Sequence, residues 1–301
     1  SPASKAITFQ STTEATISLL DADPGLLGAL NGVVNYMAIV DADRSTENLS
    51  RSIRTAYVLE QEFAQAQDQL LQRQRVGSGF GAFPGYDPDP LSTAYALETL
   101  SLLGITQEPA AYALQYLINA QNDDGSWALA GDVGRVQTTA LAMHALWQYR
   151  HVYDVESPLQ AAEDFLLAQQ ESELWGDTES SSLALYALIS RAVDRASLQQ
   201  ALDALQNRQS PRGDFEQDVY VTALALRVLA AASRPAADIT SLAGTLVDAQ
   251  SGQPLSGVEI ALDGAESRQL VTGADGDFFA DRLIPGHYQL SMNKGGYSTL
   301  V

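Results

Sequence analysis

Apolar residues recur along residues 50–232 in two alternating patterns, which predict two kinds of helix. In the first kind, apolar positions follow the spacing i, i+3, i+4, i+7, as in residues 198–205 (LQQALDAL), and Gln, Glu and Asp occupy the opposite face. The second kind is apolar nearly all round, as in residues 140–147 (ALAMHALW) and 223–229 (ALALRVL). A helix that is apolar on every side must be covered on every side. We therefore expect an inner layer of the second kind and an outer layer of the first.

The two kinds of helix are joined by a turn that occurs four times. The four segments are 73–104, 120–147, 168–192 and 205–232. Each carries a Gln near the end of the outer helix, a Gly beside an aromatic residue, and a helix start rich in Ser and Thr. The aromatic residues are Phe83, Trp127, Trp175 and Phe215, at spacings of 44, 48 and 40. A period of roughly 40–45 residues is typical of repeat architectures built from helix pairs.

Each feature of the turn suggests a structural role. A glycine can take a positive φ and end the outer helix, and the glycines at this position are Gly125, Gly176 and Gly213. The aromatic side chain would fill the gap between neighbouring helix pairs. A Ser, Thr or Asp would cap the inner helix, and the expected caps are Asp89 (followed by Pro90), Thr138, Ser180 and Asp218. All four turns should then lie at one end of the domain.

Gln121 and the GSW of residues 125–127 are similar to the QW-type repeat of squalene–hopene cyclases. The pattern over residues 50–232 resembles the α/α toroid of the terpenoid cyclase and protein prenyltransferase superfamily. The thioester domain of alpha-2-macroglobulin and complement proteins and the cobalamin carriers share that fold. The resemblance implies a fold rather than an activity.

The first 49 residues are expected to add one more helical hairpin. Asp23 and Pro24 would begin one helix, and Asp43 or Ser45 would cap the next. Residues 50–75 fit either one long helix or two. This gives about five helix pairs, fewer than the roughly six of a closed toroid, which leaves open an incomplete or truncated ring.

The pattern changes to a period of two after the segment SRPAADITS at 233–241, which predicts a small all-β unit. Strands are expected at 243–248 and 257–262 around a Ser-Gly turn, followed by strands around an Asp-Gly turn at 275–276 and after a Pro-Gly turn. The residues that carry a resemblance to a carboxypeptidase regulatory-like domain, a transthyretin-like β-sandwich, are Gly244, 254–260 (PLSGVEI), 272–278 (TGADGDF), 285–288 (PGHY) and 296–297 (GY).

We therefore expect a multidomain chain: an all-α helical-hairpin domain over 1–235, a linker over 236–242, and the β-sandwich over 243–301, continued beyond Val301 in the natural protein. The second resemblance implies an accessory module of the sort frequent in exported bacterial proteins. A secreted, periplasmic or cell-surface location follows from that resemblance.

Composition excludes several classes of function. The chain has no cysteine, which rules out disulfides, an internal thioester and the sulfur-ligated zinc of prenyltransferases. Its net charge is −20 with two lysines, Lys5 and Lys294, so it should repel nucleic acid and anionic membranes. The longest apolar run, 33–40, is too short to span a bilayer. We expect neither a metal nor a cofactor.

Two groups of residues are candidates for catalysis. Class II terpenoid cyclases protonate an alkene with the middle Asp of a DxDD motif; here Asp87 and Asp89 stand in a comparable place, but Pro90 replaces the last Asp. A helix cap and turn explain the same residues. His144 lies on an inner helix and could form an acid–base pair with Tyr95 or Tyr186, as in a polysaccharide lyase, or could simply be a core histidine. Of the other histidines, His151 ends the same helix and His287 lies in the β unit.

Three aromatic residues are candidates for ligand binding: Trp127, Trp175 and Tyr95. The tryptophans could stack on sugars or lipids at the rim, yet their repeated position also fits plugs between helix pairs. The end that carries the glycine–aromatic turns is the expected binding face, because helix N-termini converge there.

The absence of a complete catalytic motif favours a non-catalytic exported binding or assembly module, with an unknown protein, glycan or lipid-like partner. The alternatives are an enzyme of the cyclase or polysaccharide-lyase type, and a structural subunit that self-assembles through an open helix ring or β-edge. A deep cavity with a polar floor that holds Asp87, Asp89 and His144 would favour an enzyme. A cavity packed shut by Leu and Trp would favour the binding module.

Overall fold

The structure is a computed structural model, and it describes residues 5–30, 32–39, 44–129, 135–150, 152–191, 195–233, 240–264, 268–283 and 288–297. Asp43, His151, His287 and most of the expected linker lie outside these ranges. The helices, including the 3-10 helix η1, are α1 (Lys5–Ala22), η1 (Pro24–Leu26), α2 (Leu27–Leu30), α3 (Gly32–Ile39), α4 (Thr46–Val58), α5 (Ala64–Leu71), α6 (Pro90–Leu102), α7 (Ala110–Asn119), α8 (Arg135–Trp147), α9 (Glu156–Ala168), α10 (Thr178–Ser190), α11 (Arg195–Asn207) and α12 (Val219–Ser233).

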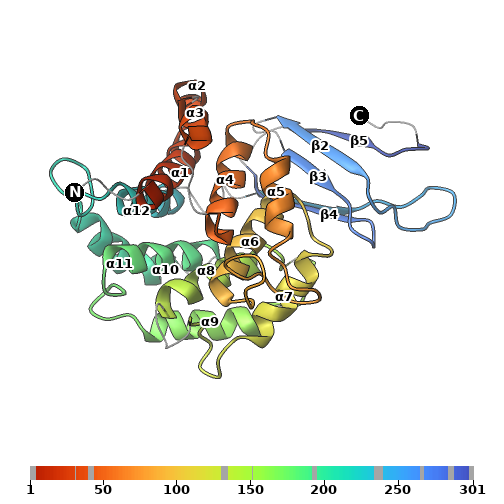
Figure 1. The fold of residues 1–301 in the computed structure, drawn as a ribbon. Helices are drawn as coiled ribbons and strands as arrows, with labels where there is room; N and C mark the ends of the chain where they lie inside the picture. The colour runs from red at the N-terminus through yellow and green to blue at the C-terminus, as the bar shows by residue number, and fades with distance from the viewer. Residues whose placement is uncertain are drawn as a thin grey trace.

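Among the described residues, six helices form a closed inner ring. Each of α1, α4, α6, α8, α10 and α12 packs on the next, and α1 packs on α12 to complete the circle (Figure 1). The open question of an incomplete ring is therefore answered: the inner layer closes, with the N-terminal helix α1 as its sixth member. Residues 50–75 form two helices, α4 and α5.

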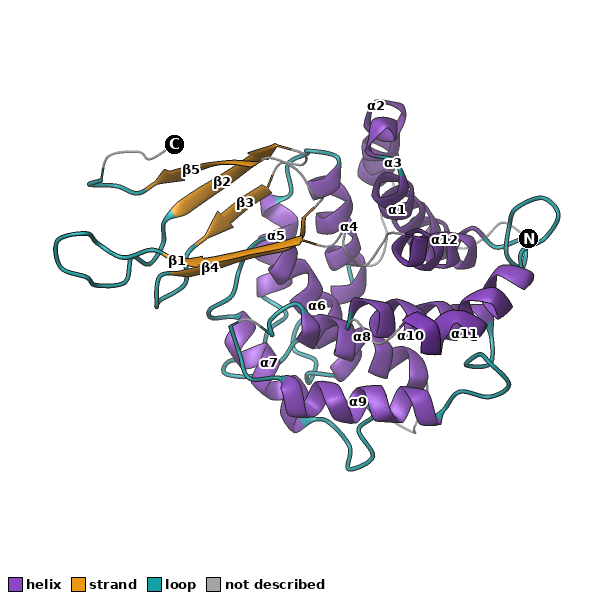
Figure 2. Cartoon of the chain, turned by 180° about the vertical axis from the view of Figure 1, so that it is seen from behind, coloured by secondary structure: helices purple, strands orange, loops and turns teal. Residues whose placement is uncertain are grey.

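Alanine allows the inner helices to pack closely, and it is buried where neighbouring helices meet. The buried alanines include Ala94 and Ala96 of α6, Ala140, Ala142 and Ala145 of α8, Ala184 and Ala187 of α10, and Ala223 and Ala225 of α12. The prediction that residues 140–147 and 223–229 lie inside is confirmed. The outer helices α5, α7, α9 and α11 cover α4, α6, α8 and α10 respectively (Figures 1 and 2).

Two members of the ring break the rule that inner helices are apolar all round. On α1, Thr13, Glu14, Thr16 and Ser18 are buried; on α4, Thr46, Ser50, Arg51 and Thr55 are buried. Among these residues, Glu14 of α1 and Arg51 of α4 form an ion pair with each other inside the ring. The hydrophobic pattern therefore could not identify them as inner helices.

The repeated turn is held by hydrogen bonds at its aromatic residue. The backbone N–H groups of Phe80, Trp127, Trp175 and Phe215 donate to hydroxyl oxygens of Thr93, Thr139, Ser181 and Thr222, at 3.0, 2.9, 3.1 and 2.9 Å. The aromatic residue of the first repeat is therefore Phe80, not Phe83 as the spacing predicted. Phe80 is fully buried, whereas Phe83 is half-buried and packs on Tyr86.

The Ser and Thr at the helix starts thus hold the aromatic residue more often than they cap the helix. The caps of α6 and α10 are Asp89 and Asp177, whose side chains accept from the N–H groups of Ser92 and Ser180, both at 2.7 Å. Asp218 accepts from the N–H of Val221 near the start of α12. The predicted caps Asp89 and Asp218 are confirmed, whereas Thr138 lies inside α8 and Ser180 inside α10.

The glycines take positive φ as predicted but do not end the outer helices. Gly125 and Gly213 lie two residues before the aromatic residue, with φ of 86° and 89°, and the helices before them end at Asn119 and Asn207. In the third repeat Glu173 holds this position with φ of 93°. A glutamine closes each loop instead: Gln121 donates from Nε2 to the carbonyl oxygens of Gly125 and Pro158, both at 2.9 Å.

The β module consists of β1 (Thr240–Thr245), β2 (Glu259–Gly264), β3 (Arg268–Val271), β4 (Asp277–Leu283) and β5 (Tyr288–Asn293). β1 pairs antiparallel with β4, and β2 pairs antiparallel with both β3 and β5. The first two strands therefore do not form one hairpin, although Val247 and Pro254 make a bridge around the Ser-Gly turn. β1 begins at Thr240, within the expected linker.

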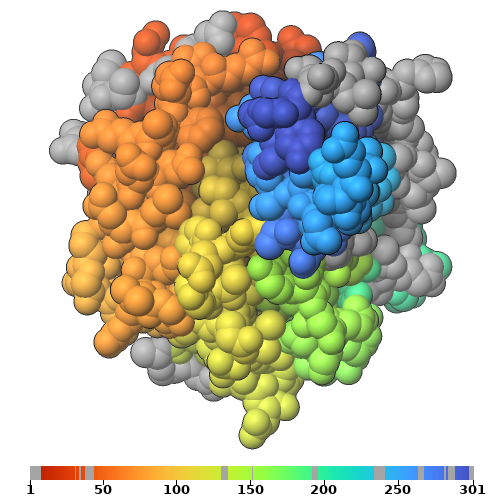
Figure 3. All heavy atoms as spheres, turned by 90° about the vertical axis from the view of Figure 1, so that its right-hand side faces the viewer, coloured from red at the N-terminus to blue at the C-terminus, as the bar shows by residue number. Residues whose placement is uncertain are grey.

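The β module rests against the helical domain, where its strands, in blue, meet orange, yellow and green segments (Figure 3). Gly104, at the end of α6, lies next to the backbone of Gln269 and Leu270 of β3. None of the helices in the described residues has both the length and the apolar character that a bilayer crossing requires.

Candidate functional site

The two aspartates considered as acids lie at the turn end of the ring, outside any cavity. Asp87 is exposed and forms an ion pair with Arg75, and Asp89 caps α6. α6 leads inward from this cap, and Glu98 lies nine residues along it, about 13 Å away at 1.5 Å per residue. Glu98 does face the interior. The structure therefore separates Asp87 and Asp89 from His144, which lines the cavity together with Glu98.

The two tryptophans considered as ligand contacts are plugs in the core. Trp127 is fully buried and Trp175 nearly so. Their indole N–H groups donate to the carbonyl oxygens of Leu117 and Leu166, at 2.7 and 2.6 Å. These carbonyls belong to the last turns of α7 and α9, where each also accepts from the backbone N–H of the C-cap residue, Ala120 or Gln169. The tryptophans are thus satisfied inside the fold and have no surface for a ligand.

The centre of the ring holds a buried charge network around Arg51. Its guanidinium donates to Glu14 at 2.8 Å, to Glu47 at 2.9 Å, and to the phenol oxygens of Tyr95 and Tyr220 at 3.1 and 3.2 Å. Tyr95 is therefore a member of this network, and it does not line the larger cavity described below. The space left at the centre is about 20 Å³, room for about one water molecule and too little for a ligand.

A second chain of polar groups runs from α4 across the ring to α8. Arg54 donates to Oε2 of Glu98 at 2.7 Å, and Nδ1 of His144 lies 2.7 Å from Oε1 of the same carboxylate. The amide nitrogen of Gln148 lies 3.0 Å from Nε2 of His144 and donates to it when the imidazole is neutral. The ring of Tyr186 lies 4.9 Å from that of His144.

Both buried carboxyl groups are held in their ionised form. Burial by itself would raise the pKa of Glu14, but the guanidinium groups of Arg227 and Arg51 lower it to about 2. Burial likewise opposes ionisation of Glu98, yet Arg54 and His144 lower its pKa to about 2. Neither group can therefore donate a proton as a general acid near neutral pH.

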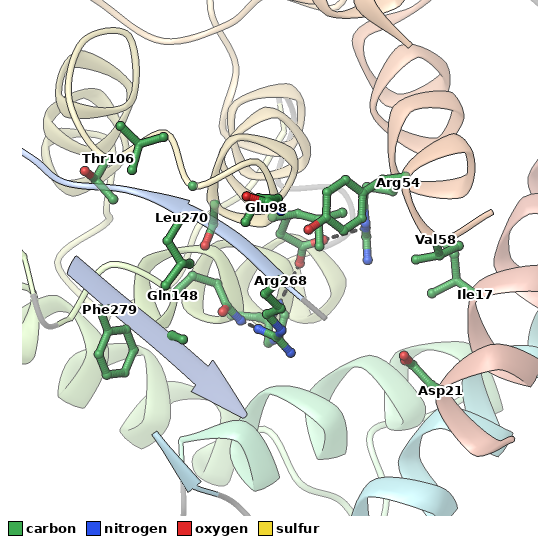
Figure 4. Close-up of a pocket in the computed structure, with 18 of the residues that line it drawn as sticks. Ile17, Asp21, Arg54, Val58, Glu98, Thr106, Gln148, Arg268, Leu270 and Phe279 are labelled. Atoms are coloured by element: carbon green, nitrogen blue, oxygen red, sulfur yellow. Dashed lines mark hydrogen bonds and ion pairs between the residues drawn. The ribbon is translucent and has the colours of Figure 1, made fainter. Parts of the chain in front are cut away.

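A cavity of about 300 Å³ lies between the far end of the ring and the β module. Its floor is polar and includes Arg54, Glu98, His144 and Arg227. Figure 4 shows Arg54 and Glu98 on one side, Asp21 on another, and Arg268, Leu270 and Phe279 contributed by strands of the β module. The cavity lies at the C-terminal ends of α6 and α8, whereas the sequence predicted the turn end as the binding face.

The β module is fixed over this cavity by contacts with α8 and the loop after α6. The guanidinium carbon of Arg150 lies 3.7 Å from the ring centre of Trp147 and 5.5 Å from that of Phe279 in β4. A cation between two aromatic faces is a favourable contact in a partly dry interface. The β module therefore supplies part of the cavity wall.

The comparisons with known proteins agree with both parts of this architecture. The model of the carboxypeptidase regulatory-like domain family matches residues 241–301. No curated protein matches the chain. Among solved structures, an ent-copalyl diphosphate synthase from Streptomyces platensis superposes with a TM-score of 0.60 at 19% identity, over 76% of this chain and 51% of its own.

Two further structures superpose over most of their own length. The type II terpene cyclase MstE from Scytonema gives a TM-score of 0.60 at 14% identity, over 73% of this chain and 86% of its own. A protein from Actinoplanes gives 0.62 at 14%, over 76% and 90%. The helical domain is an α/α toroid. At these identities the likeness shows the fold alone, and this chain spans about half the length of the copalyl diphosphate synthase.

The toroid's central residues were mostly missed by sequence reasoning. Glu14, Arg51, Arg54 and Glu98 were not singled out, because none belongs to a recognised motif. One signal was available: Glu98 and Arg227 are lone charges on inner helices that are otherwise apolar. A charge on such a helix is buried and must find a partner of opposite charge.

The sequence analysis expected a deep cavity with a polar floor in an enzyme and a closed cavity in a binding module. The structure meets each of these conditions in part. The cavity has a polar floor that includes His144, as an enzyme would need, but Asp87 and Asp89 are elsewhere. The ring centre is filled, though by charged side chains rather than by Leu and Trp. The arrangement can hold a small molecule, and its ionised carboxylates and bound histidine are engaged with one another.

Proposed function

We propose that the protein is a non-catalytic binding module that holds a small ligand between the toroid and the β module. The observation that carries the proposal is that the space for a ligand lies under the β module and not at the centre of the ring. The ring centre, filled by a paired charge network, leaves about 20 Å³, and the cavity of about 300 Å³ lies under the β module. That volume is at the lower end of the range for small-molecule sites.

The electrostatics of the cavity also support binding over acid catalysis. A cyclisation started by protonation requires a protonated acid that faces the substrate. The carboxyl group of Glu98 stays ionised because Arg54 and His144 lower its pKa. Such a site is suited to hold a ligand by fixed charges.

An exported or cell-surface location is part of the proposal. It is supported by the similarity of residues 241–301 to a domain that occurs in extracellular proteins. Fractionation of the native host, with detection of the protein in the medium or envelope, is the measurement that checks it.

The binding proposal is tested by blocking the cavity with matched substitutions. Val271 lines the cavity and is 45% exposed; Val247, also in the β module, is 51% exposed and does not line it. We expect a thermal-shift screen of small amphipathic acids, amines and alcohols to find a class that stabilises the wild type and V247W but not V271W. A screen in which no class binds, or in which V271W responds like V247W, would overturn the proposal.

One observation favours a second function, an acid–base enzyme of the polysaccharide-lyase type. His144 lies in the cavity, its Nδ1 is bound to Glu98, and Tyr186 is beside it. A carboxylate that orients a histidine raises the basicity of the other ring nitrogen. Ultraviolet detection of unsaturated products from uronate polymers would support this reading, provided that H144Q abolishes the signal while Y153F keeps it.

Assembly is a third proposal, and the β module is its basis. In the three-stranded sheet of the described residues, β3 and β5 are edge strands, which can pair with another chain. The closed inner ring removes the other route considered, insertion of a helix into the ring. Light scattering coupled to size exclusion distinguishes an assembly from a monomeric binder.

A further inference from the structure

The buried charges beside the cavity do not balance, and their imbalance indicates the ligand's charge. Three guanidinium groups lie in the interior: the side chains of Arg51, Arg54 and Arg227 are 2%, 12% and 11% exposed. Two carboxylates share their level of burial, Glu14 at 3% and Glu98 at 7%. The nearest further carboxylates, Glu47 and Asp21, are 32% and 43% exposed. Burial of an uncompensated charge is costly unless a partner offsets it.

Two of these arginines line the cavity with hydrogen-bond donors to spare. A guanidinium has five N–H donors. Within the described residues, Arg54 donates one hydrogen bond, to Glu98, and Arg227 donates one, to Glu14, both at 2.7 Å. Nε of Arg227 is buried without a hydrogen-bond partner, with the carboxylate of Asp21 at 3.7 Å. The face of the Arg227 guanidinium is occupied by Tyr186, at 4.3 Å, so its edge is the part that remains for a ligand.

The carboxylates that line the cavity are, by contrast, already engaged, and Asp21 forms an ion pair with Arg227 at 3.7 Å. One oxygen of Glu98 accepts from Arg54 and the other contacts His144. Asp277, on the β4 side, accepts from the hydroxyl of Thr245 at 2.5 Å. The unused donors in the cavity belong to the charged guanidinium groups of Arg54 and Arg227, and the group that complements them is an acceptor with negative charge.

Part of the remaining wall is apolar, and this part determines the rest of the ligand. Ile17, Val58, Leu102, Leu270 and Phe279 line the same cavity as the two arginines. Its volume of about 300 Å³ has room for roughly ten water-sized groups at ~30 Å³ each. A molecule of that size with one apolar end and one charged end would contact both the apolar part and the arginine-lined part of the wall.

We infer that the cavity binds a small carboxylic acid with a short apolar chain, with the carboxylate on Arg54 and Arg227. The inference rests on the proposed function and adds the chemical class of the ligand. The carboxylate accepts from the free guanidinium edges and supplies the missing buried negative charge. The chain lies between α4, the end of α6 and the β module.

Octanoate is the probe that tests the inference, with octylammonium and octanol as controls of the same chain length. By titration calorimetry on the full chain, we expect saturable octanoate binding at least tenfold tighter than that of either control. Hexadecanoate should bind more weakly than octanoate, because the cavity is too short for it. V271W should lose octanoate binding, and V247W should keep it.

Two conservative variants test the arginines without removing their charge. R54K and R227K keep a cation but lose the planar set of donors, and each should weaken octanoate binding about tenfold while octanol is unaffected. Tight octanol or octylammonium binding that V271W abolishes would overturn the carboxylate inference and leave the proposed function standing. No binding of any of the three probes would overturn both, and octanoate binding that V271W retains would overturn the assigned site.

Discussion

The two ends of the toroid are built in different ways. At the turn end, four copies of one arrangement join successive helices: a buried aromatic residue whose backbone N–H donates to a Ser or Thr hydroxyl of the next inner helix. At the far end, residues that each occur once, such as Arg54, Glu98 and Arg227, come together from three helices under the β module. The repeated turns hold neighbouring helices together, and the end without repeats contains the cavity and the unused guanidinium donors. The fold and the proposed binding site thus depend on opposite ends of the same helices.

The largest effect should come from the buried aromatic residue of the first turn. Phe80 is fully buried, so F80A should lower the free energy of unfolding by about 3–5 kcal/mol through lost burial and a residual cavity. F83A, three residues away at a half-buried site, should cost much less. Urea unfolding of both variants measures the difference; equal losses would mean that Phe80 is not the plug of this repeat.

The charge network at the ring centre should tolerate the loss of one partner poorly. E14Q leaves Arg51 and Arg227 without their shared buried carboxylate, at 2.8 and 2.7 Å. Breaking one member of a buried ion pair costs about 3–5 kcal/mol, and the remaining contacts of Arg51 with Glu47 place this substitution near the lower value. The exposed pair at the turn end supplies the control, and D87N should leave urea unfolding unchanged.

Acid should destabilise the toroid because both of its buried carboxyl groups titrate. The pKa values of Glu14 and Glu98 are about 2 in the folded state, against an ordinary value of 4.5. The folded values are depressed, so their contribution is complete above pH 4.5 and is lost as the pH falls towards 2. Each contributes on the order of 3 kcal/mol. Denaturant unfolding from pH 5.5 to 2.5 should show a shallower loss in E98Q than in the wild type; identical slopes would contradict the prediction.

A smaller effect should separate two glycines of the turn end. An added Cβ at Gly125 would collide with the backbone carbonyl of Ala161 in α9, and φ there is 86°. Gly176 has a similar φ of 80° but open space around it. G176A should therefore cost about 1 kcal/mol of backbone strain, and G125A about 2 kcal/mol more because a helix must shift. Thermal unfolding of the two variants checks this, and equal unfolding midpoints would show that α9 shifts without a cost in free energy.

The turn end could be predicted in outline because its determinants are local and repeated. The aromatic residues, glycines and apolar helices recur at similar spacings, and Trp127, Trp175 and Phe215 occupy the expected positions. The assignment of Phe83 failed because two phenylalanines lie within one glycine-rich loop, and only packing selects between them. The caps at Thr138 and Ser180 failed because a hydroxyl near a helix start can serve either the helix or the neighbouring loop.

The far end could not be predicted because its residues meet only in the folded chain. Arg51 contacts Tyr220, which is 169 positions away, and Arg227 contacts Glu14, which is 213 positions away. No local pattern encodes such pairs, and the polar inner faces of α1 and α4 hid these helices from a hydrophobic criterion. In the sequence, the single charges of Glu98 and Arg227 on otherwise apolar helices were the feature that indicated this network.

The sequence alone therefore determined the helical repeat, the change to a β module and the exclusion of thiol chemistry, since each depends on residue type and short-range period. Tertiary structure decided that α1 closes the ring, that the ring centre is filled, and that the cavity lies under the β module. The physical reason is that periodicity specifies which face of a helix is buried, whereas charge pairing across a ring depends on which helices become neighbours.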